Sequence, residues 1–193
     1  QSRATVSGGT NANFASKMAL YVRPPGSPYF SQVISTNDTV RLGDEIQLRC
    51  DIEHGKGWQY SRIKDVTLQQ NSGLNTGNSI VLVGHDGCRN PRMKAVCPWH
   101  PVQHSDRPLT SSFTWKVFGF QDNVRGNEEM VVTAQVLACV HPSDCSLDTS
   151  SCEGETPIAR NRRHYNDMLA NNETALCEND LTFKVKLQSD GSS

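Results

Sequence analysis

The sequence predicts an all-β domain, a sandwich or a barrel, and three observations support this fold class. First, apolar and polar residues alternate with a period of two in several segments, which is typical of half-buried strands. Second, clusters of turn-forming residues separate those segments, as in NSGLNTGN, GHDG and DNVRGN. Third, the 193 residues include seven cysteines, which favours disulfide bonds in an oxidising compartment.

The clearest strand lies within residues 40–52, where Gly43 and Asp44 mark a predicted β-bulge. Its apolar face contains Val40, Leu42, Ile46, Leu48, Cys50 and Ile52. The same signals predict further strands at residues 58–70, 79–83, 111–120, 129–140 and 181–187. Residues 161–176 are the one segment with the composition to form a helix, but they lack a continuous apolar stripe.

The two ends of the chain differ in composition. Residues 1–16, QSRATVSGGTNANFAS, are rich in Ser, Gly, Asn and Thr, which predicts a flexible linker from an upstream domain. Residues 181–187, LTFKVKL, predict a strand with a single apolar face. That face contains Leu181, Phe183, Val185 and Leu187.

The charge balance argues against nucleic acid and anionic membranes as partners. There are 19 basic and 20 acidic side chains, and the net charge is -1, so no basic patch is expected. The longest apolar runs, such as residues 18–22, are about a quarter of a membrane span. Membrane attachment would therefore need an anchor outside this chain. Acceptor sequences for N-glycosylation at Asn37 and Asn172 favour a secretory route, and we expect an extracellular protein.

The spacing of the cysteines favours disulfides over a metal or redox site. The cysteines are Cys50, Cys88, Cys97, Cys139, Cys145, Cys152 and Cys177. No two of them form a C-x-x-C pair, which argues against a zinc knuckle and a thioredoxin-like motif. The five from 88 to 152 are predicted to cluster near one end, with a bridge from residue 139 or beyond to the 88–97 loop; the pairing stays open.

Because seven is an odd number, one thiol stays free or pairs outside the chain. Cys50 lies on the apolar face of its strand, where a buried and inert thiol is the simplest interpretation. Cys177 is the better candidate to tie the carboxy-terminal segment to the rest of the domain.

No spacing singles out a catalytic, cofactor or metal site. His100 and His104 have a metal-like separation, but Pro101 prevents their display on one helical face, so loop histidines are expected. The serines of TSSF and TSSC lack a nucleophile elbow, and we do not expect an enzyme. The three tryptophans are predicted to pack in the core or at an edge instead of forming ligand platforms; they are Trp58, Trp99 and Trp115.

The strongest local motif is Arg-x-Arg-Arg, formed by Arg160, Arg162 and Arg163. Furin-type secretory proteases cut after this pattern, because acidic subsites pair with the guanidinium groups. A basic cluster of this length is also common in solvated loops, which is the alternative.

The order of these features resembles the carboxy-terminal half of a zona pellucida (ZP) domain. The resemblance covers residues 17 to about 187 and follows KMALYVRPPGSPYF, VRLGDEIQL, SIVLVGHDGC, FTWKVFGF, VVTAQVLACVHPSDC and then Arg-x-Arg-Arg. It implies an immunoglobulin-like β-sandwich with extra strands and a disulfide-rich end over residues 17–159. A cleavage loop at 160–163 and a propeptide-like segment at 164–193 would follow.

The resemblance also implies a function. Proteins of this family polymerise into extracellular matrix filaments, and two apolar strands control their assembly. The internal patch corresponds to Met18, Leu20 and Val22, and the external patch corresponds to Leu181, Phe183, Val185 and Leu187. The expected partners are other ZP-domain subunits, in a homopolymer or heteropolymer, and a furin-type protease. The alternative is the ligand-binding ectodomain of a co-receptor.

The sequence departs from the family pattern at its cysteines. The family usually has a cysteine near Gln69, bonded to one at the position of Ala134, and both are missing here. Cys50 and Cys97 have no clear counterpart, and a bridge between them stays open. A disulfide from Cys177 would hold the external patch in place after cleavage.

Overall fold

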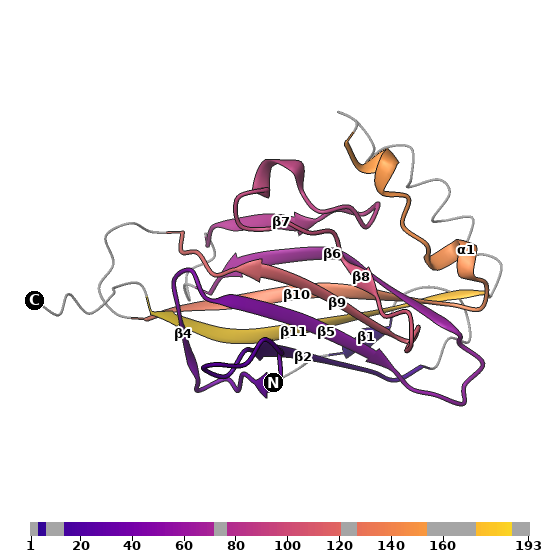
Figure 1. Cartoon of the computed structure of the whole chain (residues 1–193), viewed down its shortest axis with the longest axis horizontal. Coiled ribbons are helices and arrows are strands. Elements are labelled where there is room, and N and C mark those ends of the chain that lie inside the picture. Colours follow the sequence, from indigo (N-terminus) through magenta and orange to yellow (C-terminus); the bar gives the residue numbers. More distant parts are fainter. Residues whose placement is uncertain (1–3, 7–13, 72–76, 121–126, 154–172, 187–193) are drawn as a thin grey trace, which may run out of the picture.

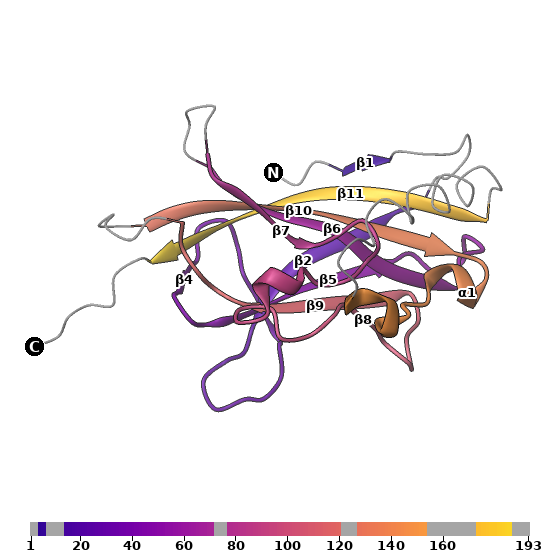
Figure 2. The same ribbon diagram turned by 90° about the horizontal axis from the view of Figure 1, so that it is seen from above.

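The structure is a computed structural model that describes residues 4–6, 14–71, 77–120, 127–153 and 173–186. Two β-sheets pack face to face (Figures 1 and 2), which confirms the predicted all-β sandwich. Each sheet is open rather than closed on itself, so the barrel alternative is wrong. The arrangement also agrees with the immunoglobulin-like sandwich that the resemblance implies.

The first sheet has six strands, in the order β1-β11-β10-β6-β7, with β4 beside β11. Its pairs are antiparallel, except that β4 and β11 run parallel. The strands are β1 (Ala4–Val6), β4 (Thr39–Arg41), β6 (Tyr60–Gln70), β7 (Ser79–Val83), β10 (Asn127–Cys139) and β11 (Thr174–Lys186).

The second sheet has five strands in the order β3-β2-β5-β9-β8, and all its pairs are antiparallel. The strands are β2 (Ser16–Val22), β3 (Gln32–Val33), β5 (Glu45–Ile52), β8 (Val102–Gln103) and β9 (Thr110–Lys116). Three short helices complete the described chain: η1 (Pro91–Met93), α1 (Pro142–Cys145) and η2 (Thr149–Glu153).

Alternation creates the core between the sheets. On β5, Ile46, Leu48, Cys50 and Ile52 are all buried, as their period of two predicts. Aromatic rings join the two layers: Trp115 of β9 stacks on Phe113 at 5.7 Å and meets Phe183 of β11 edge-on at 6.5 Å. Burial of three large rings makes this contact a main source of hydrophobic stabilisation.

The bulge predicted at Gly43 and Asp44 is a turn that carries the chain from one sheet to the other. Gly43 has a φ of +85°, and the Asp44 carboxylate accepts a hydrogen bond from the Arg41 amide at 2.9 Å. The predicted single strand at 40–52 is therefore two strands, β4 and β5. Because Leu42 lies in this turn, it is 45% exposed instead of buried.

Other predicted boundaries also shift. The strand predicted at 111–120 ends at Lys116, which pairs with Glu45, the first residue of β5; the Val117 amide still bonds to the Asp44 carbonyl in the preceding turn. The helix considered for 161–176 is wrong at its end, since Thr174 already begins β11; its residues 161–172 lie outside the described residues. Within the predicted linker, Ala4–Val6 form β1, and Phe14 is buried against Trp58.

Candidate functional site

The candidate site is β11, which lies inside the first sheet rather than at its edge. On one side it pairs antiparallel with β10 along all 13 of its residues. On the other side, β1 pairs with residues 177–179 and β4 pairs with residues 184–186. In the described part of the chain, residues 180–183 have no strand on that second side. β11 therefore satisfies the whole edge of β10 but leaves a short edge of its own open.

The two faces of β11 differ in chemistry. Phe183 and Val185 of the external patch are 1% and 0% exposed and face the core, and Leu181 is half-buried against it. The opposite face carries polar pairs with β10: Thr133 donates to Asp180 at 2.7 Å, and Gln135 donates to Glu178 at 3.0 Å. Leu187 lies outside the described residues.

The internal patch lies on β2 of the second sheet. Met18 and Leu20 are buried, and Val22 is half-buried against the same core. β2 lies beside β11, since the Asn179 amide donates to the Ser16 hydroxyl at 3.3 Å. The structure thus brings the two predicted patches together across the sandwich.

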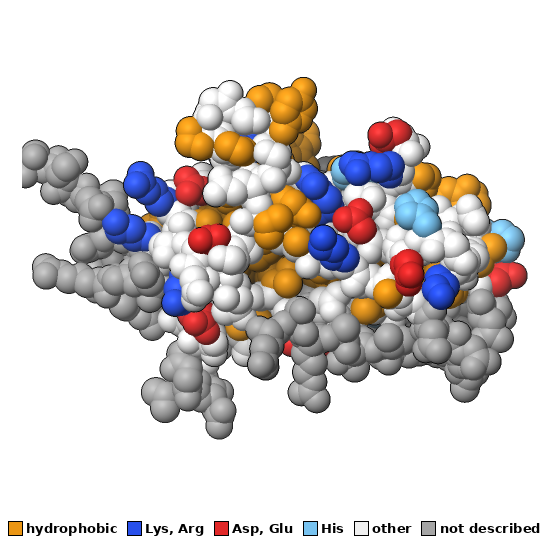
Figure 3. Space-filling model, turned by 90° about the horizontal axis from the view of Figure 1, so that it is seen from below, with side chains coloured by type: hydrophobic (Ala, Val, Ile, Leu, Met, Phe, Trp, Pro, Cys, Tyr) orange, Lys and Arg blue, Asp and Glu red, His pale blue; other side chains and the backbone are white. Residues whose placement is uncertain are grey.

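A groove opens where the two patches meet. Its volume is about 240 Å³, and Met18, Leu20 and Ile34 line one wall while Asp180, Leu181 and Thr182 line the other. Figure 3 looks onto this edge of the molecule and shows hydrophobic side chains between charged ones. The groove runs beside the open edge at residues 180–183, so an extended segment would find both backbone partners and apolar contacts there.

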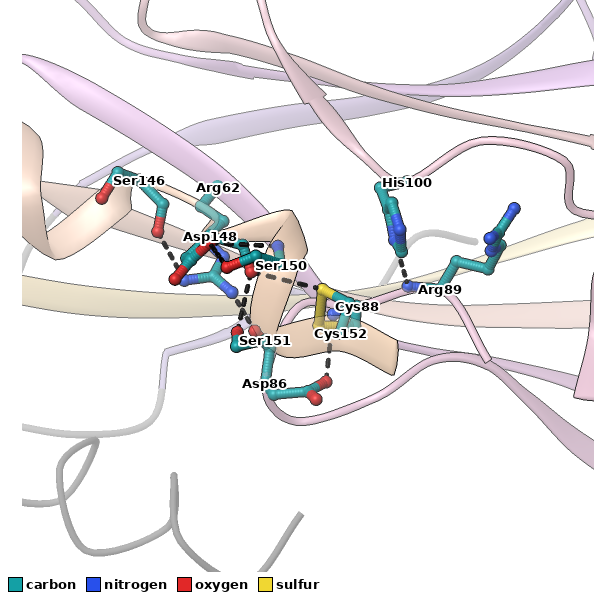
Figure 4. The surroundings of a disulfide bond; sticks show 10 residues. All are labelled: Arg62, Asp86, Cys88, Arg89, His100, Ser146, Asp148, Ser150, Ser151 and Cys152. Atoms are coloured by element: carbon teal, nitrogen blue, oxygen red, sulfur yellow. Dashed lines mark hydrogen bonds between the residues drawn. A yellow bond between two sulfur atoms is a disulfide. The ribbon is translucent and has the colours of Figure 1, made fainter. Parts of the chain in front are cut away.

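The disulfide-rich end precedes the Arg-x-Arg-Arg motif in the sequence. Cys88 bonds to Cys152 and Cys139 bonds to Cys145. The first of these reaches from beyond residue 139 back to the 88–97 loop, as predicted. Two disulfides fit an extracellular location. Arg62 reinforces this end (Figure 4), because its guanidinium donates to the Ser146 carbonyl at 3.0 Å and also to the Asp86 carbonyl.

The charge of Asp86 and the backbone turn at Gly87 shape the surroundings of the Arg62 guanidinium. Burial lowers the pKa of Arg62, and the Asp86 carboxylate beside it raises it. The same carboxylate accepts from the Cys88 amide at 3.0 Å, which orients the disulfide loop (Figure 4). Gly87 has a φ of +80° and lies against the Arg62 guanidinium, so the turn needs glycine there.

Three cysteines carry free thiols in the structure: Cys50, Cys97 and Cys177, all of them buried. Burial raises the pKa of Cys50 well above its ordinary value, with Asp51 and Cys177 adding to the effect, and burial raises the pKa of Cys97 to about 12. Both thiols are therefore protonated and unreactive in the folded chain.

The open alternative of a bridge between Cys50 and Cys97 is not formed. Cys50 is paired with Ser111 on β9, whereas the loop that contains Cys97 is bonded to Lys116 through the Val96 carbonyl. Ser111 and Lys116 are five residues apart on β9, which corresponds to about 17 Å along the strand. The bridge expected from Cys177 is also absent: Cys177 lies opposite Val136 of β10, and its thiol is free although it is close enough to the equally free Cys50 to raise the pKa of that thiol.

The remaining predicted residues are dispersed. Asn37 is exposed in the turn before β4, while Asn172 and the motif residues Arg160, Arg162 and Arg163 lie outside the described residues. His100 accepts from the Arg89 amide, and His104 contacts the Ser112 hydroxyl at 3.1 Å. Among the described residues, no three His, Cys, Asp or Glu side chains are grouped to hold a metal ion.

The tryptophans divide into two groups. Trp58 and Trp115 pack in or against the core, as predicted. The prediction for Trp99 is wrong, since it is 68% exposed. It lines a pocket of about 110 Å³ together with Phe30 and Glu45.

Sequence reasoning missed half of β11 and all of β1, and it did not separate β4 from β5. The signal for the missed half was present, because Ala175 and Cys177 continue the odd-numbered apolar face of residues 181–187. No local pattern predicts that β1 and β4 pair with β11, since each has only three residues.

Comparison with known proteins adds no assignment. No protein-family model matches the chain, and no curated protein matches it. In the part of the chain that the structure describes, no helix is long and apolar enough to cross a membrane.

Proposed function

We propose that this chain is the polymerisation module of a secreted or membrane-anchored precursor, similar to the carboxy-terminal half of a ZP domain. In this proposal, β11 blocks assembly until a furin-type protease cuts after Arg163. The precursor then assembles with other ZP-domain subunits into extracellular matrix filaments. The observation that carries the proposal is the position of β11 between β10 and its neighbours β1 and β4.

The energetic consequence of losing β11 supports this role. Its departure would leave the 13-residue edge of β10 unpaired and would uncover the core beside Trp115. An unpaired edge above an apolar surface is a template for another strand. A strand from a second subunit would restore both the hydrogen bonds and the burial.

The chain connection supports the same sequence of events. The motif Arg160 to Arg163 falls between Glu153, the last residue of η2, and Thr174, the first residue of β11. Before cleavage, β11 is tethered and rebinds at a high effective concentration. After cleavage, its departure becomes irreversible once it diffuses away.

The experiment compares full-length precursor with the double variant Arg162→Ala, Arg163→Ala. We expect normal secretion of the variant, no cut after residue 163 and no filaments by electron microscopy. Arg92→Ala is the matched control, because Arg92 is exposed on η1, far in sequence from the motif. Ordinary filaments from the uncut double variant would reject the proposal.

A second candidate function is a ligand-binding ectodomain, and exposed Trp99 favours it. Tryptophan is enriched at the energetic centres of protein interfaces, and Trp99 stands over a small pocket instead of packing in the core. Such a chain would bind a soluble partner as an uncut monomer. Trp99→Ala would abolish that binding, whereas it would leave filament assembly unchanged if the first proposal holds.

A further inference from the structure

Glu128 is a buried carboxylic acid on β10, directly opposite Val185 of β11. It is 6% exposed, and it shares its core-facing side with Met130 and Val132, which follow at a period of two. Acidic side chains are rarely this buried without a partner. Its position places a titratable group against the carboxyl-terminal end of β11.

The carboxylate of Glu128 is poorly compensated. One oxygen accepts a hydrogen bond from the Phe120 amide, at the long distance of 3.4 Å. The other oxygen is buried and has no hydrogen-bond partner among the described residues. A buried charge with so little compensation destabilises the structure around it.

Among the described residues, the charged side chains near this end of the sandwich form no ion pair with Glu128. They are Glu129 on β10, Lys184 and Lys186 on β11, Arg41 on β4, Asp44 in the following turn, Glu45 on β5 and Lys116 on β9. Residues 184 and 186 flank core-facing Val185 and so lie on the opposite face. Glu45 pairs with Arg23 at 3.1 Å. Within the described chain, no cation forms an ion pair with Glu128.

We propose that Glu128 makes the attachment of β11 depend on pH, firm when the carboxyl group is protonated at acidic pH and weaker when it ionises as the pH rises. This inference rests on the proposed blocking role of β11. It adds a second condition to cleavage: a lower pH would favour retention of the cut strand, and a higher pH would favour its release.

The sign of the effect follows from burial. Desolvation raises the pKa of Glu128, and the hydrogen bond from Phe120 opposes the shift. An acid whose pKa is higher in the folded state binds its proton more tightly there. Stability is therefore greatest below the ordinary pKa of a glutamic acid and falls as the pH rises through the higher, folded value.

The test measures how fast segment 164–193 leaves the cut chain, by size-exclusion chromatography between about pH 5 and about pH 8. For the unmodified sequence we expect release on the order of tenfold faster at the higher pH. Glu128→Gln should remove most of this dependence and hold the segment at both pH values. Glu53→Gln is the matched control. It makes the same chemical change, but at a side chain that is exposed beyond the end of β5.

Equal pH profiles for the unmodified chain and Glu128→Gln would overturn the inference, whether or not filaments form. Release with the expected profile but without any filaments would instead reject the polymerisation proposal and leave the pH dependence standing. Thermal unfolding of the uncut chain provides a second readout. Glu128→Gln should raise the midpoint more at the higher pH than at the lower one.

Discussion

The chain is held in two different ways on the two sides of its Arg-x-Arg-Arg motif. On the amino-terminal side, residues 139–153 are fixed by two disulfides and by the guanidinium of Arg62. On the carboxyl-terminal side, β11 is held by hydrogen bonds and apolar packing, and its one cysteine, Cys177, carries a free thiol. In the described structure, the segment before the motif is therefore bonded covalently to the rest of the domain, and β11 is not.

The first prediction weakens the noncovalent side. Phe183→Ala should lower the free energy of unfolding by about 3–5 kcal/mol, because Phe183 is fully buried against Trp115. It should also cause assembly without cleavage. Denaturant unfolding measures the loss, and Thr182→Ala, on the opposite face of β11, should change it by less than about 0.5 kcal/mol. Equal losses in the two variants would contradict the core position of Phe183.

The second prediction weakens the covalent side. Replacing Cys88 and Cys152 together by alanine should cost about 4 kcal/mol, because that bond closes a loop with a sequence separation of 64. The corresponding change at Cys139 and Cys145, with a separation of 6, should cost about 2 kcal/mol. Chemical denaturation of the two double variants gives the order. The reverse order would show that native contacts outweigh loop closure here.

The third prediction tests the reinforcement of the disulfide end. Gly87→Ala places a methyl group against the Arg62 guanidinium in addition to the strain of a φ of +80°. We expect a loss of about 2–4 kcal/mol in unfolding free energy. Gly26→Ala has nearly the same φ of +78° but open space around it, and it should cost about 1 kcal/mol. A similar loss for both variants would mean that Arg62 moves aside freely.

The last prediction concerns whether a disulfide joins the two fragments after cleavage, and it involves no change in stability. After cleavage at residue 163, Cys177 is the only cysteine in segment 164–193. Because its thiol is free in the structure, the two fragments should separate on a denaturing gel without reductant. Thiol alkylation before denaturation is the control. A single band that splits only after reduction would restore the disulfide that the sequence suggested from Cys177.

Much of the fold could be predicted from local pattern. The period of two located β5, β6 and β7 and assigned the core faces of β5 and the end of β11 correctly. It did not separate β4 from β5, because the alternation continues in phase across a turn that changes sheets. Trp99 was misassigned for a similar reason, since residue type alone does not reveal exposure.

Less of the candidate site could be predicted from the sequence. The patches on β2 and β11 were located by resemblance, but their contact in one groove depends on the packing of two sheets. The burial of Glu128 could not be predicted from the sequence, because an acidic residue at the start of a strand normally faces solvent. Its burial follows from the register of β10 against β11.

The all-β class, most strand positions and a cluster of cysteines near one end could be read from local pattern, because alternation and turn chemistry are local properties of the chain. The tertiary structure alone decided that β11 lies between β10 and β4, that Cys177 has no disulfide partner and that Glu128 is buried. A strand obtains its partners from segments that are distant in sequence, through packing that no short stretch of residues encodes.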